Sequence, residues 1–120
     1  MQTDMQDLPA VFSDIFTLAH EYQIFVPSTM QVNNACDNSE YVNKIAESLA
    51  KLEGGATITT GVGAWNSESL GLVKEDVTII SSSALNFNNA GEVLNLCRWL
   101  KTEMSQEAIA LKIDGKLFLI

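Results

Sequence analysis

The chain has 120 residues, 47% hydrophobic and 18% charged, a composition typical of a folded globular protein rather than a disordered one. Its net charge of −8 disfavours direct binding to nucleic-acid phosphates and to anionic membranes, although such acidity also simply keeps a small domain soluble. No apolar run reaches the roughly 20 residues that cross a bilayer, and residues 1–7 contain no Lys or Arg of a secretory signal. We therefore expect one cytoplasmic domain over residues 1–120.

The first expected element is a helix over residues 1–20. Asp7 and Pro9 are typical of a helix start, and apolar residues follow at helical spacing (Leu8, Val11, Phe12, Ile15 and Ala19). A short run of aromatic and β-branched residues at 22–26 then predicts a strand, which Pro27 ends. Residues 22–120 form the expected core of the domain.

Two amphipathic helices are predicted, each after a capping-box pattern. Asp37 with Glu40 three residues later starts the first helix, and Gly54 ends it. Asn89 and Glu92 repeat the pattern before the second helix. Each helix carries an apolar stripe, with Val42, Ile45, Leu49 and Leu52 in the first and Val93, Leu96, Cys97, Leu100 and Met104 in the second.

Four further strands are predicted as two hairpins. Residues 56–65 and 72–81 read as strands around a short turn. Residues 108–113 and 116–120 flank Asp114-Gly115, a dipeptide typical of a two-residue type I′ turn between strands.

This element order predicts an α+β fold, a ferredoxin-like βαββαβ antiparallel sheet with an added N-terminal helix and a C-terminal β-hairpin. Right-handed crossovers would place both central helices on one face of the sheet. The other face, with Phe25, Ile80 and Phe118 as candidate members, then needs cover from the N-terminal helix or another subunit. We therefore expect a homo-oligomer.

Several segments of the second half resemble a family of small bacterial and phage domains of unknown function. The resemblance rests on Gly63-Ala64-Trp65, on Gly71-Leu72-Val73 with Glu75, and on Gln106-Glu107-Ala108-Ile109. The element order also resembles the PII-like branch of ferredoxin-like proteins, which implies a trimeric, nucleotide-binding regulator. The turn at 66–71 is short and carries Glu68, so it departs from the long, basic-rimmed loop of PII proteins.

The predicted ligand or partner site consists of Gly61, Gly63, Trp65 and Glu75. Two glycines two apart leave a bare strip on one side of a strand, where another group can approach. Trp65 beside them either stacks on a ligand or caps the edge of the core. Glu75 interrupts an apolar row, so it lies in water at a sheet end, pairs with a Lys or Arg, or belongs to a site. Gly61-Val62-Gly63 lacks the third glycine and the following helix of a dinucleotide site.

No catalytic set, cofactor or metal site is predicted. Two cysteines, Cys36 and Cys97, and one histidine, His20, are too few for an ordinary four-ligand zinc site, and Cys97 reads as a core residue. His20, expected at a helix end, has no serine in a nucleophile pattern near it.

The leading hypothesis is a non-enzymatic regulatory or binding domain that acts as a homo-oligomer and binds a small ligand or a protein near the 61–75 hairpin. The first alternative is an acidic interaction or counter-defence protein from a mobile element, which masks a basic surface of a nucleic-acid enzyme. The second alternative is an enzyme that uses carboxylates, Glu75 among them.

Overall fold

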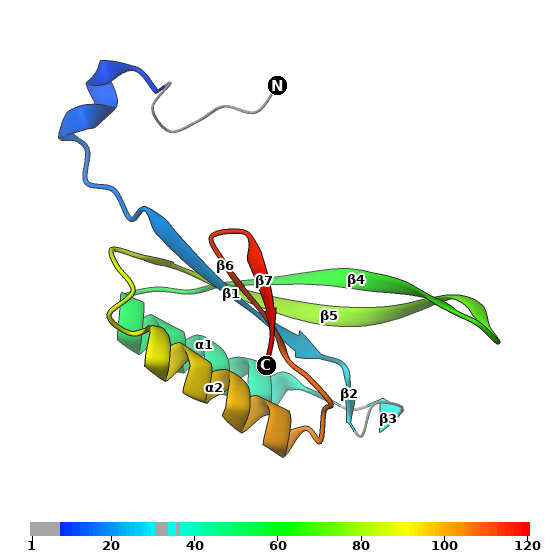
Figure 1. Ribbon diagram of the computed structural model, residues 1–120. Coiled ribbons are helices and arrows are strands. Elements are labelled where there is room, and N and C mark those ends of the chain that lie inside the picture. Colours follow the sequence, from blue (N-terminus) through cyan, green and yellow to red (C-terminus); the bar gives the residue numbers. More distant parts are fainter. Residues whose placement is uncertain (1–7, 31–33, 36) are drawn as a thin grey trace.

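The computed structural model describes residues 8–30, 34–35 and 37–120. A short 3-10 helix, Ala10–Asp14, comes first. It is followed by β1 (His20–Pro27), β2 (Thr29–Met30), β3 (Asn34–Ala35), α1 (Ser39–Glu53), β4 (Thr57–Ser67), β5 (Gly71–Ala84), α2 (Ala90–Glu103), β6 (Ala110–Ile113) and β7 (Lys116–Leu119) (Figure 1).

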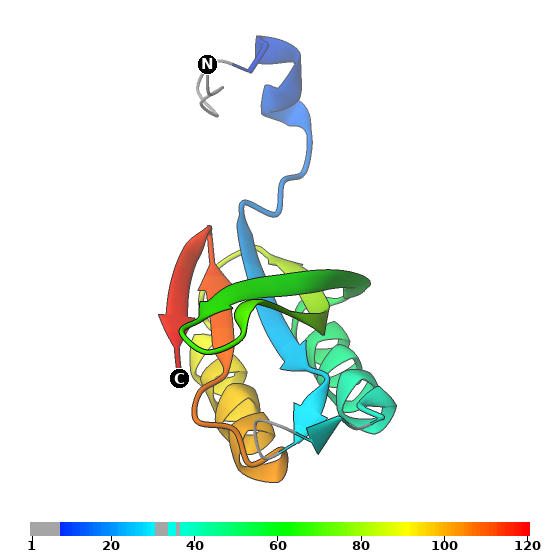
Figure 2. The ribbon, with the colours of Figure 1, turned by 90° about the vertical axis from the view of Figure 1, so that its right-hand side faces the viewer.

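Five strands form one antiparallel sheet in the order β4-β5-β1-β6-β7, and β2 and β3 pair separately. Both α-helices lie against the same face of this sheet, so its opposite face is left open (Figures 1 and 2). The predicted α+β class, the antiparallel sheet and the two covering helices are therefore confirmed. The β4–β5 hairpin is longer than predicted, and its far end projects beyond the helices (Figure 1).

The core lies between the two helices and the covered face of the sheet. The apolar stripe of each helix turns inward, as its spacing predicts. The fully or nearly buried residues of the core include Val42, Ile45 and Leu49 from α1, Val93, Cys97 and Leu100 from α2, and Tyr22, Ile24, Val26, Ile80 and Leu111 from the strands.

The β6–β7 hairpin forms as its sequence predicts. Asp114 and Gly115 have φ angles of 51° and 80°, the positive values that a type I′ turn requires at both central positions. The register places Ile113 opposite Lys116, which leaves the two turn residues between them.

The N-terminal helix expected over residues 1–20 is not formed in the described part. Residues 10–14 make only a single 3-10 turn, and His20 begins β1 instead of ending a helix. Every residue from 8 to 19 is exposed, so these residues bury no apolar face against the described part of the chain that would stabilise a longer helix. Residues 1–7, where the expected helix starts, lie outside the described residues.

Neither predicted capping box is made. The carboxylate of Asp37 accepts the backbone N–H of Ser39, at 3.0 Å, rather than capping from the residue just before the helix. Asn89 lies at the N-cap of α2, but its amide donates to the carbonyl of Leu52 and to Glu53, both at 3.1 Å. This side chain therefore ties the start of α2 to the end of α1.

Two of the three residues expected on the open face lie on the other face. Ile80 is fully buried beneath the helices, because it has the same parity along β5 as the buried Ser82 and Ala84. Phe118 pairs with Leu111, a core residue, and so shares its face. Phe25 does lie on the open face, opposite Ile79 of β5.

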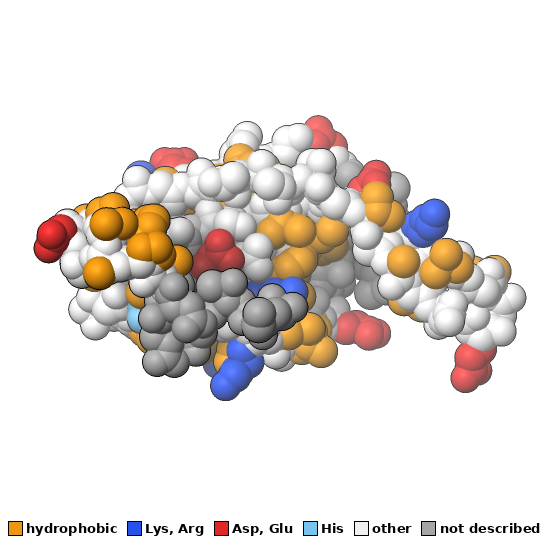
Figure 3. All heavy atoms as spheres, turned by 90° about the horizontal axis from the view of Figure 1, so that it is seen from above, with side chains coloured by type: hydrophobic (Ala, Val, Ile, Leu, Met, Phe, Trp, Pro, Cys, Tyr) orange, Lys and Arg blue, Asp and Glu red, His pale blue; other side chains and the backbone are white. Residues whose placement is uncertain are grey.

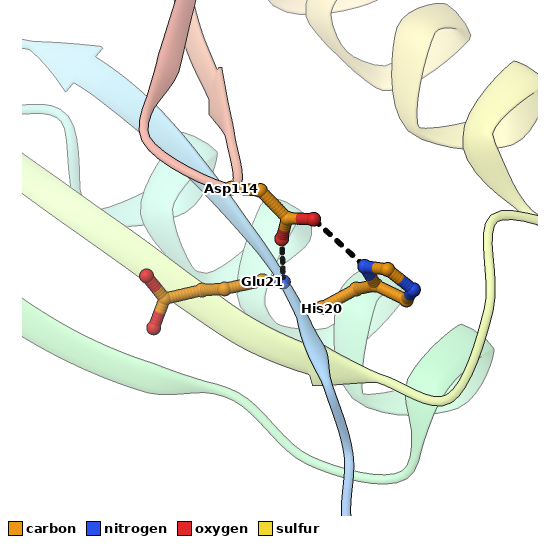
Figure 4. A network of polar contacts seen from close by, with 3 residues as sticks. All are labelled: His20, Glu21 and Asp114. Carbon is orange, nitrogen blue, oxygen red and sulfur yellow. Dashed lines mark hydrogen bonds and ion pairs between the residues drawn. The ribbon is translucent and has the colours of Figure 1, made fainter. Parts of the chain in front are cut away.

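A polar clamp fixes the start of β1 to the β6–β7 turn (Figure 4). The Nδ1–H of His20 donates to one carboxylate oxygen of Asp114 at 2.7 Å, and the backbone N–H of Glu21 donates to the other at 2.8 Å. The His20 hydrogen bond, followed by that from Glu21, lowers the pKa of Asp114 below its ordinary value. The ring of Phe87 packs on His20, with centroids 4.1 Å apart.

Cys97 is a buried core residue, as predicted, and burial raises the pKa of its thiol to about 12. Cys36 lies outside the described residues. Within the described residues, no helix has the length and hydrophobicity that a membrane span needs.

Candidate small-molecule pocket on the open face of the sheet

The open face of the sheet carries a shallow pocket of about 480 Å³, here called the open-face pocket. Its lining residues come from β1, β4, β5 and the segment that leads into β6. They are Phe25, Pro27, Gly61, Val62, Gly63, Ala64, Trp65, Glu75, Asp76, Val77, Ile79, Gln106, Ala108, Ile109 and Ala110. Seen from above, apolar side chains gather over the middle of the sheet and along the β4–β5 hairpin (Figure 3).

The register of β4 and β5 brings all four predicted site residues to this pocket. Gly61 lies opposite Val77 and Gly63 lies opposite Glu75, while Trp65 follows on the same face of β4. Alternation along the strand explains the grouping, because positions 61, 63 and 65 share one face.

The two glycines shape the floor of the pocket. A Cβ added at Gly61 would lie 3.8 Å from Cγ1 of Val77, and one at Gly63 would lie 3.7 Å from the carbonyl oxygen of Glu75. Both distances are ordinary van der Waals contacts, so no described neighbour requires glycine at these positions. What the missing side chains provide is open space above the strand.

Trp65 is 53% exposed, so the expectation that it caps the edge of the core is wrong. Trp65 lies opposite Val73 on the open face and lines the pocket, which leaves an aromatic surface available to a planar ligand.

Glu75 is half-buried and is held by a hydrogen bond rather than by an ion pair. The hydroxyl of Thr29 donates to its carboxylate at 3.2 Å, and the amide of Gln106 donates to the carbonyl of Thr29 at 2.7 Å. Within the described residues no Lys or Arg lies in ion-pair distance of Glu75. The Thr29 hydroxyl therefore positions the carboxylate at the pocket, and Gln106 holds the backbone of Thr29.

The pocket is otherwise short of groups that transfer protons. Asp76 is the only other acidic residue of its lining, and as the next residue of the strand it points to the opposite face from Glu75. Among the described residues, no three His, Cys, Asp or Glu side chains come together as metal ligands do. The arrangement suits recognition of a largely apolar molecule with one positive charge.

Sequence reasoning missed Phe25, Thr29 and Gln106 as members of this site. The sequence predicts Phe25 on the open face but does not link it to the two glycines. Its position in the central strand is the signal that could have made this link. Gln106 and Thr29 are 77 residues apart, and no local pattern indicates their hydrogen bond.

The fold and pocket define an α+β protein with a one-sided antiparallel sheet and a small-molecule-sized hollow on its open face. Two solved structures share this fold. A phage SAM lyase in complex with S-methyl-5′-thioadenosine matches with a TM-score of 0.63 and 21% identity, over 84% of this chain and 88% of that chain. The phage SAM lyase in its apo state matches with the same TM-score and 19% identity, over 84% and 87%. No protein-family model matches the sequence, and curated proteins give no significant match.

These neighbours contradict the leading functional hypothesis. Both are structures of an enzyme, a lyase, and this conflicts with the hypothesis of a non-enzymatic regulatory or binding domain. They give no support to an acidic protein that masks a basic partner, nor to an enzyme built on carboxylate catalysis. The expected homo-oligomer is not tested by these structures and stays a prediction.

Proposed function

We propose that this chain binds S-adenosylmethionine in the open-face pocket and cleaves it as a lyase, releasing S-methyl-5′-thioadenosine. The observation that carries the proposal is the shared fold, over 84% of the chain, with a phage SAM lyase that holds this thioether. The pocket volume of about 480 Å³ agrees with it, since small-molecule sites span roughly 300–1,000 Å³.

The apolar part of the pocket suits the adenosine half of this substrate. Trp65 offers an exposed indole on which a purine can stack, and stacking of a base on an aromatic side chain contributes about 1–3 kcal/mol. Gly61 and Gly63 leave the space that the flat ring system needs beside it.

The reaction itself removes two charges. The bond between the sulfonium sulfur and Cγ of the amino-acid side chain breaks, and its electron pair stays on sulfur, which becomes a neutral thioether. The carboxylate of the substrate attacks Cγ and closes a lactone ring, so no water, proton acceptor or second substrate is consumed. Because a cation and an anion both disappear, apolar surroundings favour the transition state over the charged substrate.

Glu75 has a binding role in this scheme. A carboxylate beside the sulfonium would stabilise the charged ground state and slow the reaction. The α-ammonium group keeps its charge throughout, so we assign Glu75 to that group, with Thr29 orienting the carboxylate. A hydrogen bond to a charged group contributes about 1.5–3 kcal/mol, which corresponds to roughly 10- to 150-fold in affinity.

We also propose that the core is a ferredoxin-like fold extended by β7. The order β1-α1-β4-β5-α2-β6 along the chain, with α1 and α2 on one face, supports this assignment.

The test is incubation of the purified protein with S-adenosylmethionine, with product detection by liquid chromatography and mass spectrometry. The expected products are S-methyl-5′-thioadenosine and the lactone, well above a blank without protein. Glu75→Gln should raise KM more than it lowers kcat, because the carboxylate binds a charge that does not change in the reaction.

The matched control is Glu68→Gln, which removes a carboxylate from the exposed turn between β4 and β5 and should leave the rate unchanged. Formation of S-methyl-5′-thioadenosine no faster than in the blank would contradict the proposal. So would activity that Glu75→Gln and Glu68→Gln alter equally.

A further inference from the structure

Gln106 lies between α2 and β6, is half-buried, and lines the open-face pocket together with Glu75. The end of α2 fixes its backbone, because the N–H of Gln106 donates to the carbonyl of Lys101 at 3.0 Å. Ser105, just before it, has a φ angle of 52°, in the left-handed region that commonly ends a helix. The side chain of Gln106 therefore starts from a fixed point beside the pocket.

The side-chain amide of Gln106 joins two segments that are far apart in the sequence. Its nitrogen donates to the carbonyl of Thr29 at 2.7 Å and to that of Met104 at 3.2 Å. Both acceptors are backbone carbonyls, which cannot donate, so the nitrogen of the amide and not its oxygen must face them. The two N–H groups thus tie β2 to the end of α2.

Thr29 connects this attachment to Glu75. The hydroxyl of Thr29 donates to the Glu75 carboxylate at 3.2 Å, while its carbonyl accepts the hydrogen bond from Gln106. Within the described residues β2 and β3 pair only with each other, so the ladder of the main sheet does not hold Thr29 in place. Loss of the Gln106 hydrogen bond would leave the Thr29 hydroxyl less well aimed at the carboxylate.

We propose that Gln106 is a positioning residue for recognition of the α-ammonium group of the substrate. It holds Thr29 so that the Thr29 hydroxyl keeps the Glu75 carboxylate aimed at that group. This inference rests on the proposed function and on the role of Glu75 within it. A ligand without the amino-acid part makes no use of Glu75, so Gln106 should affect only ligands that carry the α-ammonium group.

The test compares two ligands by isothermal titration calorimetry. S-adenosylhomocysteine carries the α-ammonium group and has a neutral thioether in place of the sulfonium, whereas S-methyl-5′-thioadenosine has no amino-acid part. Gln106→Met keeps the length of the side chain and removes both N–H donors. It should lower the affinity for S-adenosylhomocysteine about three- to tenfold, as one lost hydrogen bond does, and should change that for S-methyl-5′-thioadenosine by less than about twofold.

The matched control is Gln23→Met. Gln23 is also a half-buried glutamine whose amide donates a hydrogen bond, to the hydroxyl of Ser81 at 3.3 Å, but it does not line the pocket. Its substitution should leave both affinities unchanged. A double-mutant cycle tests whether Gln106 acts through Glu75. In a Glu75→Gln background, Gln106→Met should have little further effect on the affinity for S-adenosylhomocysteine.

Three results would overturn the inference alone. Equal loss of affinity for both ligands would show that Gln106 only maintains the shape of the pocket. An effect of Gln106→Met that is the same with and without Glu75→Gln would show that it does not act through the carboxylate. Unchanged affinity for S-adenosylhomocysteine would show that the hydrogen bond to Thr29 has no role in binding. An unaltered protein that binds neither ligand would instead overturn the proposed function, and this inference with it.

Discussion

Replacing Gly61 or Gly63 by alanine should separate the stability of this protein from its ligand binding. An added Cβ meets its nearest neighbours at 3.8 Å at position 61 and at 3.7 Å at position 63, so neither alanine clashes. Glycine inside a strand costs roughly 0.5–1 kcal/mol relative to alanine, because the unfolded chain loses more freedom on folding. Each substitution should therefore raise the free energy of unfolding by about that amount.

The same substitutions should weaken binding. Each Cβ projects into the open-face pocket, where the proposed ligand packs against the strand. Over-packing a fitted contact typically costs about 1–3 kcal/mol, which corresponds to roughly 5- to 150-fold in affinity for S-methyl-5′-thioadenosine.

Urea unfolding followed by circular dichroism gives the first quantity, and isothermal titration calorimetry gives the second. The glycine at position 91, on the exposed face of α2, provides the control, since nothing lies within 4 Å of its added Cβ. Gly91→Ala should stabilise the protein without changing affinity. If Gly61→Ala destabilised the fold, or if it left affinity unchanged, the reasoning about the glycines would be refuted.

Three further predictions concern single side chains. Trp65→Ala should change the free energy of unfolding by only about 0.5 kcal/mol, because the indole is largely exposed. The same substitution should lower affinity for S-methyl-5′-thioadenosine about tenfold or more. Trp65→Phe should restore part of the lost affinity. Asp114→Asn should lower the melting temperature at neutral pH, since hydrogen bonds, first that from His20, lower the pKa of the carboxyl group in the folded state. That stabilisation exists above the unfolded-state pKa of about 4 and is lost as pH falls through the lowered folded-state pKa. The melting temperatures of the unaltered protein and of Asp114→Asn should therefore converge in acid. A difference in melting temperature that stays constant with pH would contradict the assignment. In a Cys36→Ser background, Cys97 should resist iodoacetamide in the folded protein and react after unfolding, because burial raises the pKa of its thiol to about 12; rapid alkylation without unfolding would show that the core opens.

Local patterns were sufficient for most of the fold. The stripes of the two helices, the Asp114-Gly115 turn and the β4–β5 hairpin each depend on residues close in sequence. Each formed at the expected place, although the hairpin is longer than predicted. Strand alternation and the hairpin register are also short-range properties, and they bring Gly61, Gly63, Trp65 and Glu75 to one pocket. That these four residues bind a ligand or partner stays a prediction.

The errors arose where distant contacts decide the outcome. The apolar spacing after Pro9 indicates a helix, yet residues 8–19 stay exposed and bury no apolar face against the described residues that would stabilise one. Asn89 is a residue type that typically caps a helix, but its side-chain amide donates a hydrogen bond to the carbonyl of Leu52 at the end of α1. The parity of Ile80 could not be assigned until the helices were placed over one face of the sheet.

The most direct test of the central claim is a titration of the ¹⁵N-labelled protein with S-methyl-5′-thioadenosine, followed by NMR. If the open-face pocket binds the ligand, the amides of Gly61 and Gly63 and the indole N–H of Trp65 should shift together and saturate at one affinity. Signals from α2 beside Arg98 should stay in place. Shifts confined to α2 and β7, or no shifts at millimolar ligand, would contradict the account.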